Sequence, residues 1–179
     1  MDALEPLDSL VIRCQRGDQE AFETLFSQFQ PRLQFYVRRL STPSDHGEDV
    51  LQEVWVKVIR KIKTLRDPRA FTAWLYQIAR NEVLSKFRTK DPLKGLSDEP
   101  VDSLAAEEEP DFSQESATRV HEGLNRLKAH HREVLTLFFL EAMSYLQIAE
   151  VLDLPLGTIR SRLFHAKHSL RQALESTHG

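Results

Sequence analysis

The fold of this chain is decided by residues 144–170, SYLQIAEVLDLPLGTIRSRLFHAKHSL. Ser144 and Gln147 have the spacing of a capping box, in which each side chain bonds the other residue's backbone N–H at the start of a helix. Asp153 then begins a predicted tight turn, and Pro155 suits the start of the next helix, where its missing N–H costs nothing. A capped short helix, a turn and a second amphipathic helix predict a DNA-binding helix-turn-helix.

The second helix of this motif is predicted to have a buried face and a DNA face. Phe164 lies away from the apolar stripe, where it would be exposed and where a thymine methyl could cover it. Arginine side chains beside it can fork onto a guanine edge or hold a phosphate. The predicted buried stripe is Ile159, Leu163, Ala166, Leu170 and Leu174. The residues expected to meet DNA are Thr158, Arg160, Ser161, Arg162, Phe164 and His165.

Charge is distributed unevenly along the 179 residues, although 24 Lys+Arg and 27 Asp+Glu leave a formal net charge of only -3. Residues 31–90 carry 13 basic and 6 acidic residues, whereas residues 91–118 carry 1 and 9. The acidic stretch has prolines and no apolar periodicity, which predicts a flexible linker. The basic block suggests a polyanion partner, and a solvated basic face is the alternative. The predicted domains are 1–90 and 119–179, with the linker at 91–118.

Composition excludes several classes of protein. The chain has no apolar run of the 18 or so residues that a membrane span needs, and no signal sequence at its start, so we expect a cytoplasmic protein without membrane insertion. Its one cysteine, Cys14, excludes an internal disulfide or a cysteine metal cluster. His130 and His131 are expected at a solvated helix start, and no carboxylate or cysteine completes a metal site beside them. We therefore expect no enzyme, no metal and no cofactor.

The N-terminal block is predicted to be helical, as is the rest of the chain, because no strand pattern of useful length occurs. Asp8 or Ser9 can cap a first short helix. Gly17 and Asp18 end that helix and cap a second one, which contains or is kinked at Pro31. The expected fold class is therefore all-α, with two small helical domains.

Residues 48–62, EDVLQEVWVKVIRKI, predict a helix with one buried side. Asp49 and Glu53 fall on the opposite, exposed side, together with Val56 and Arg60. Two carboxylates and a valine on an exposed face make a plausible docking surface. The predicted buried residues are Leu51, Val54, Trp55, Val58 and Ile62.

A further helix is predicted to open at Asp67 and Pro68, an N-cap followed by proline, and to run to about Arg88. One apolar face comprises Phe71, Trp74, Leu75 and Ile78, and a second places aromatic residues beside Arg80. Rings and cations together suit stacking on unpaired bases. The alternative is that Tyr76, Val83 and Phe87 pack on a neighbouring helix. The cations that end the helix are Lys86, Arg88 and Lys90.

Taken in order, these segments resemble the extracytoplasmic-function sigma factors, the minimal promoter-recognition subunits of bacterial RNA polymerase. The resemblance covers nearly all of the chain and includes the recurring D-x-x-Q-E of the polymerase-binding helix. The alternative function is an autonomous helix-turn-helix regulator whose N-terminal helices dimerise or sense a signal, with no polymerase partner of its own. A helical metal or nucleotide enzyme is a third class. The segments that carry the resemblance are 21–40, 48–62, 69–88 and 154–174.

The resemblance implies a role for each matching residue. Asp49, Gln52 and Glu53 would bind the clamp helices of core RNA polymerase. The loop from Thr64 to Pro68 would receive a flipped base. The residues implied at the unpaired minus-ten strand are Tyr76 and Asn81, with the cations Arg80, Lys86 and Arg88 beside them.

The same resemblance assigns the minus-thirty-five duplex to Arg160, Ser161, Arg162 and Phe164. Two residues depart from the family pattern: Ser85 stands where aspartate is frequent, and His165 stands where arginine is frequent. The implied partners are core RNA polymerase and promoter DNA. For many relatives an anti-sigma factor is a further partner, and nothing in this sequence identifies one.

Overall fold

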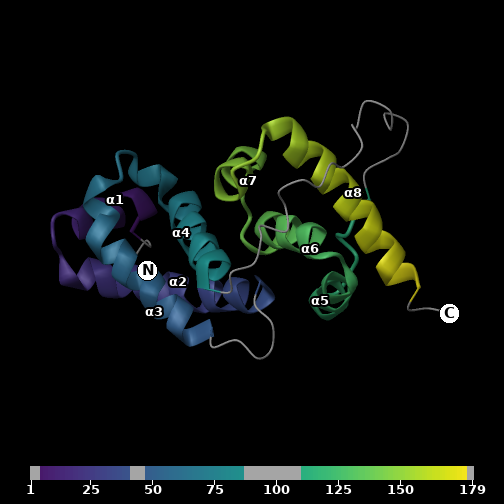
Figure 1. The fold of residues 1–179 in the computed structure, drawn as a ribbon, viewed down its shortest axis with the longest axis horizontal. Coiled ribbons are helices and arrows are strands. Elements are labelled where there is room, and N and C mark those ends of the chain that lie inside the picture. Colours follow the sequence, from purple (N-terminus) through teal and green to yellow (C-terminus); the bar gives the residue numbers. More distant parts are fainter. Residues whose placement is uncertain (1–4, 41–46, 87–109, 177–179) are drawn as a thin grey trace. The chain divides into compact units, whose positions relative to one another are not determined.

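The computed structural model describes residues 5–40, 47–86 and 110–176 (Figure 1). All regular elements in these ranges are helices, so the predicted all-α class is confirmed. The chain divides into two compact units, Met1–Thr89 and Lys90–Gly179.

In its described residues, the first unit is built from four α-helices and two short 3₁₀ helices. α2 packs against α1 and α3, and α4 packs against both α2 and α3. The core between them contains the side chains of Leu25, Tyr36, Val54, Phe71 and Leu75, each fully buried. The elements are α1 (Leu7–Gln15), α2 (Gln19–Leu40), α3 (Gly47–Lys61), η1 (Ile62–Thr64), η2 (Pro68–Ala70) and α4 (Phe71–Lys86).

The turn between α1 and α2 follows the sequence prediction. Gly17 has a φ of 89°, a conformation that residues with a Cβ rarely adopt, and Asp18 Oδ1 accepts the Ala21 backbone N–H at 3.1 Å. Pro31 lies inside α2. The predicted cap of α1 is wrong, because α1 follows Pro6 and neither Asp8 nor Ser9 caps it.

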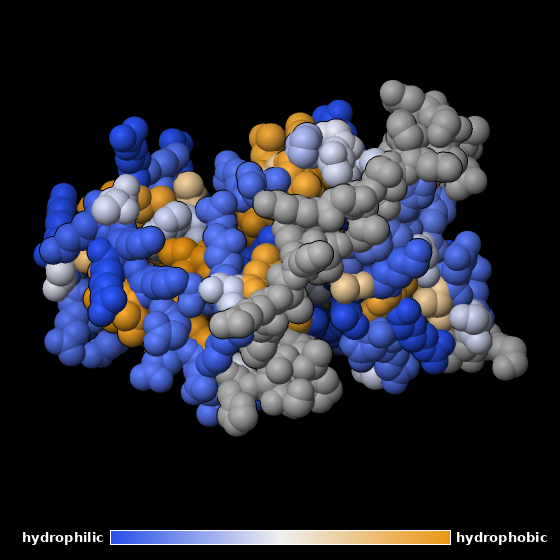
Figure 2. All heavy atoms as spheres, viewed as in Figure 1, coloured by the Kyte–Doolittle hydropathy of each residue, from blue (hydrophilic) through white to orange (hydrophobic). Residues whose placement is uncertain are grey.

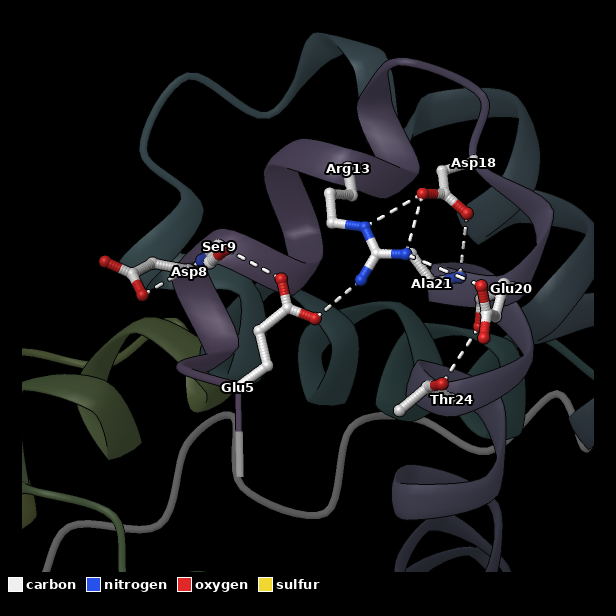
Figure 3. A network of polar contacts seen from close by, with 8 residues as sticks. All are labelled: Glu5, Asp8, Ser9, Arg13, Asp18, Glu20, Ala21 and Thr24. Atoms are coloured by element: carbon white, nitrogen blue, oxygen red, sulfur yellow. Dashed lines mark hydrogen bonds and ion pairs between the residues drawn. The ribbon is translucent and has the colours of Figure 1, made fainter. Parts of the chain in front are cut away.

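An ionic network fastens α1 to the start of α2 (Figure 3). The guanidinium of Arg13 lies 2.8 Å from both Glu5 Oε2 and Asp18 Oδ2. The N–H of Ala21 and the Arg13 guanidinium both lower the pKa of Asp18. The network therefore holds Asp18 as a carboxylate where it caps α2.

The second unit contains the predicted helix-turn-helix. The capping box of Ser144 and Gln147 is present, and Asp153 ends α7 in the left-handed conformation, with a φ of 53°. Pro155 is the residue before α8 rather than its first residue. The elements are α5 (Ala117–Arg126), α6 (Ala129–Leu135), a π-helix η4 (Thr136–Leu140), α7 (Tyr145–Leu152) and α8 (Leu156–Glu175).

Two expectations near the start of this unit are corrected. The stretch predicted as linker to residue 118 already packs at its end: the ring centroid of Phe112 lies 5.5 Å from that of Phe139, and Arg171 lies over the Phe112 ring. His130 and His131 begin α6 but are buried, each 8% exposed, with their rings 4.3 Å apart. Phe112 is therefore half-buried although most of residues 110–118 are exposed, and the two histidines are buried rather than solvated.

Candidate nucleic-acid and protein interfaces

α3 presents one exposed polar face. Asp49, Gln52 and Glu53 are all exposed, and their spacing of three and four residues makes them neighbours on the helix surface. In Figure 2 the part of the first unit that includes α3 shows mostly hydrophilic residues, with apolar ones between them. The opposite side of α3 is buried at every position predicted, namely Leu51, Val54, Trp55 and Val58, with Ile62 just beyond the helix.

Contacts with two neighbouring helices fix the rotation of α3 and so keep that polar face outward. The indole Nε1 of Trp55 donates to Gln30 Oε1 on α2 at 2.6 Å, and its ring packs against Phe22 with centroids 5.9 Å apart. On the other side Lys57 forms an ion pair with Glu82 of α4. The polar face of α3 is therefore kept outward by core packing on one side of the helix and by an ion pair on the other.

The second face of α4 is not the exposed stacking surface that the sequence suggested. Tyr76 is fully buried, with its ring centroid 5.1 Å from that of Tyr36, and Arg80 and Val83 are 3% and 2% exposed. The physical reason is that α4 packs against both α2 and α3, so two of its sides are covered. Tyr76 and Val83 therefore pack on neighbouring helices, which was the alternative interpretation of this face.

Other polar residues of α4 remain accessible. Asn81 and Lys86 are exposed, and Lys86 Nζ lies 3.2 Å from Asp49 Oδ2. Ser85 is exposed beside them. Phe87, Arg88 and Lys90 lie outside the described residues.

The loop that precedes α4 is exposed and internally bonded. Asp67 accepts the backbone N–H of Arg69 at 3.0 Å and its guanidinium Nε at 3.1 Å, and these bonds lower the pKa of Asp67. Thr64 Oγ1 donates to the carbonyl of Lys61 at 2.7 Å. The Gln15 side chain of α1 donates to the backbone carbonyls of Ile62 and Leu65. The exposed loop residues are thereby held at both ends.

The recognition helix α8 exposes fewer of its predicted residues than expected. Arg160 is exposed, and Thr158 and His165 are half-buried. Ser161 and Arg162, which the sequence places among the residues that meet DNA, are 7% and 0% exposed. The predicted apolar stripe from Ile159 to Leu174 is buried throughout.

Phe164 also differs from expectation. Its side chain is 7% exposed, and its ring centroid lies 4.4 Å from that of His168 and 5.6 Å from that of His165. α8 packs against α5, α6 and α7, so more than one of its sides is covered, and Phe164 is buried although the helical wheel placed it in solvent.

Comparison with known proteins gives the family. The Sigma-70 region 2 model matches residues 25–92, and the Sigma-70 region 4 model matches residues 117–170. The RNA polymerase sigma-H factor of Pseudomonas aeruginosa is 33% identical over 93% of this chain and 92% of its own. The ECF RNA polymerase sigma-E factor of Escherichia coli K12 is 33% identical over 90% of each chain. The chain belongs to the extracytoplasmic-function sigma factors.

Solved structures agree with this sigma factor's fold. One is the sigma factor RpoE in complex with the anti-sigma factor NepR from Bartonella quintana, 26% identical over 86% of this chain and 96% of that one, with a TM-score of 0.63. Another, CnrH in complex with the cytosolic domain of CnrY, is 24% identical over 95% and 97%, with a TM-score of 0.66. As a family member, the protein is a polymerase-binding, promoter-specific initiation factor, and the autonomous regulator is not favoured.

Some residues that position the candidate interfaces of this sigma factor were missed by sequence reasoning. Gln15 bonds backbone carbonyls that are 47 and 50 residues away, so no local pattern could reveal its contact. Lys57 and Glu82 are separated by 25 residues, and only their placement on facing helices joins them.

In the described ranges, none of the helices is both long and apolar enough to cross a membrane.

Proposed function

We propose that this sigma factor docks on core RNA polymerase through Asp49, Gln52 and Glu53. The observation that carries the proposal is that all three are exposed on one face of α3 while the opposite face is buried. Charged groups at the rim of an interface steer association and set its register. A basic surface on polymerase would complement the two carboxylates.

For the minus-ten element we propose that Asn81 and Lys86 contact the unpaired strand and that the loop from Thr64 to Pro68 receives a flipped base. Exposure of both side chains and of most of the loop supports this assignment. Tyr76 and Arg80 then act by packing, because both are buried. Arg88 keeps its proposed role, although it lies outside the described residues.

For the minus-thirty-five element we propose contacts from Arg160, Thr158 and His165. Their accessibility on α8 supports this reduced set. Ser161, Arg162 and Phe164 are then residues that shape the helix rather than bind DNA, which fits their burial. A recognition helix reads base edges with its accessible N-terminal residues.

Two promoter contacts in one chain gain from effective concentration, since binding through one unit raises the local concentration of the other. Stacking of a captured base is worth about 1–3 kcal/mol, against a few kcal/mol for unstacking it. Capture of the melted strand therefore offsets much of the cost of opening. In this scheme the protein supplies specificity and no chemistry of its own, and needs no cofactor.

We also propose that the protein acts in the cytoplasm, where core polymerase and promoters are found, and that an anti-sigma factor binds it. The support for the second point is the similar Bartonella quintana structure, in which RpoE is complexed with NepR. Co-purification from its native cell, followed by reconstitution of the pair, would identify such a factor.

Run-off transcription tests the central proposal. Core polymerase with this protein should start RNA at a defined position on a genomic template library, and core alone should not. The recovered templates would supply the promoter needed for finer tests. Binding of the free protein to discrete DNA sites without any polymerase-dependent start would instead support an autonomous regulator.

A further inference from the structure

Gln15 is the last residue of α1 and binds the loop that precedes α4. Its Nε2 donates to the carbonyl oxygen of Ile62 at 2.9 Å and to that of Leu65 at 2.8 Å. The Leu65 backbone N–H also donates to the Ile62 carbonyl, at 3.2 Å. The Gln15 amide thus bonds both ends of one tight turn, which runs from Ile62 to Leu65.

The helix that carries Gln15 is packed and paired on several sides. α1 buries Leu10, Val11 and Cys14 in the core of the first unit. Arg13, two residues before Gln15, is fixed by its ion pairs with Glu5 and Asp18. α1 also packs against both η1 and η2, the two short helices on either side of the loop. A change in the loop backbone would therefore be resisted through Gln15.

We propose that Gln15 is a positioning residue for the base-receiving loop, acting through the backbone of Ile62 and Leu65. This inference rests on the proposed function of the loop from Thr64 to Pro68. Asp67 fixes the far end of that loop through its bonds to Arg69. A binding site tolerates about 0.5 Å of misplacement, so a loop that keeps its local bonds but loses those from Gln15 would capture the base less often.

The test uses the full chain bound to core polymerase and forked promoter DNA from the run-off experiment. An abasic nucleotide is placed at each minus-ten position in turn, and affinity is compared with intact DNA. For the wild type, loss of one stacked base should weaken binding roughly 5- to 150-fold at the flipped position. Gln15→Met retains the length and apolar stem but removes both N–H donors, and it should reduce that penalty to within about threefold of no effect.

A second variant and a matched control separate positioning from folding. Gln15→Glu keeps the size but replaces the donors with an acceptor, so it should lose the abasic penalty as well. Gln19→Ala is the control, since Gln19 is exposed on α2 and its amide donates to Glu23. Gln19→Ala should keep the wild-type penalty. Circular dichroism melts of each chain identify any variant that fails to fold.

The outcomes are distinguishable. If the wild type shows no abasic penalty at any position, the base-receiving role of the loop is wrong. If the wild type shows the penalty and folded Gln15→Met keeps it in full, the loop receives the base but Gln15 does not position it. If Gln15→Met weakens binding to intact and to abasic DNA by the same factor, the abasic penalty is unchanged. That result also overturns the inference.

Discussion

Lys86 Nζ lies 3.2 Å from Asp49 Oδ2, which joins the end of α4 to the start of α3. Both side chains are well exposed, 38% for Lys86 and 65% for Asp49, so the pair contributes about 0–1 kcal/mol to stability. The cation is proposed to hold promoter phosphate and the carboxylate to bind polymerase. In the free protein each is the other's counter-ion, and either partner can replace this weak contact at little cost.

Polymerase affinity should fall when Asp49 and Glu53 are both changed to alanine. Exposed ion pairs are worth about 0.2–1 kcal/mol each, so the expected loss is roughly 2- to 30-fold. Glu20→Ala with Glu23→Ala removes the same charge from an exposed part of α2 and should leave affinity unchanged. Titration of labelled protein with core polymerase measures both. Equal affinities for the two double variants would refute the docking assignment.

Alanine variants of Asn81 and Tyr76 should differ in their effects: the first on promoter opening, the second on stability. Asn81 is exposed, so Asn81→Ala should slow opening of duplex promoters, with little effect on templates already melted through the minus-ten element. Permanganate reactivity of unpaired thymines follows the opening. Tyr76 is buried against Tyr36, so Tyr76→Ala should instead destabilise the first unit by about 3–5 kcal/mol. An unchanged denaturation midpoint for Tyr76→Ala would contradict the packing role.

Sequence patterns predicted helices well where one side packs and the other is solvated. The faces of α3 follow from this rule, because its wheel has a clear apolar side. α4 did not obey it, since α2 and α3 cover two of its sides and bury Tyr76 and Arg80 among them. A single-sided wheel assigns any aromatic residue off the main stripe to solvent, and Phe164 was misplaced for the same reason.

Cys14 should be unreactive in the folded protein. Burial raises the pKa of its thiol to about 11, and the thiolate is the species that reacts. At pH 8 the thiolate fraction of the folded protein is therefore roughly a thousandth, compared with about a quarter for a free thiol of pKa 8.5. Iodoacetamide labelling followed by mass spectrometry should be slow in buffer and fast in denaturant. Rapid labelling in buffer would mean that α1 opens readily.

Long-range polar contacts are the part of the molecule that the sequence did not predict. Gln15 lies at a helix end, where a polar side chain is ordinary, and it bonds carbonyls that only the tertiary fold brings near. Phe112 lies in an acidic, proline-containing stretch whose composition favours a linker. Its ring nevertheless packs against that of Phe139 and lies under the Arg171 guanidinium, and both partners are distant in the sequence.

The capping box should contribute measurably to the stability of the second unit. Ser144→Ala removes the hydroxyl that accepts the Gln147 N–H at 3.2 Å, and an N-cap of this kind is worth about 1 kcal/mol. Ser144→Asp supplies another capping oxygen and should restore most of the loss. Urea denaturation followed by circular dichroism reports both. If the aspartate variant is as unstable as the alanine variant, the cap is not the cause.

DNA affinity should distinguish two arginines on α8 that are two residues apart. Arg160 is exposed, so Arg160→Ala should lower the magnitude of the salt slope for a duplex promoter fragment by about 0.9, because one fewer phosphate is neutralised. Arg162 is fully buried, and Arg162→Ala should chiefly lower the denaturation midpoint through lost packing. His165→Arg adds a cation beside the same groove and should raise the slope by up to about one. Fluorescence anisotropy at four salt concentrations gives each slope. If Arg160→Ala leaves the slope unchanged while His165→Arg raises it, the face of α8 that meets DNA is centred on His165 and excludes Arg160.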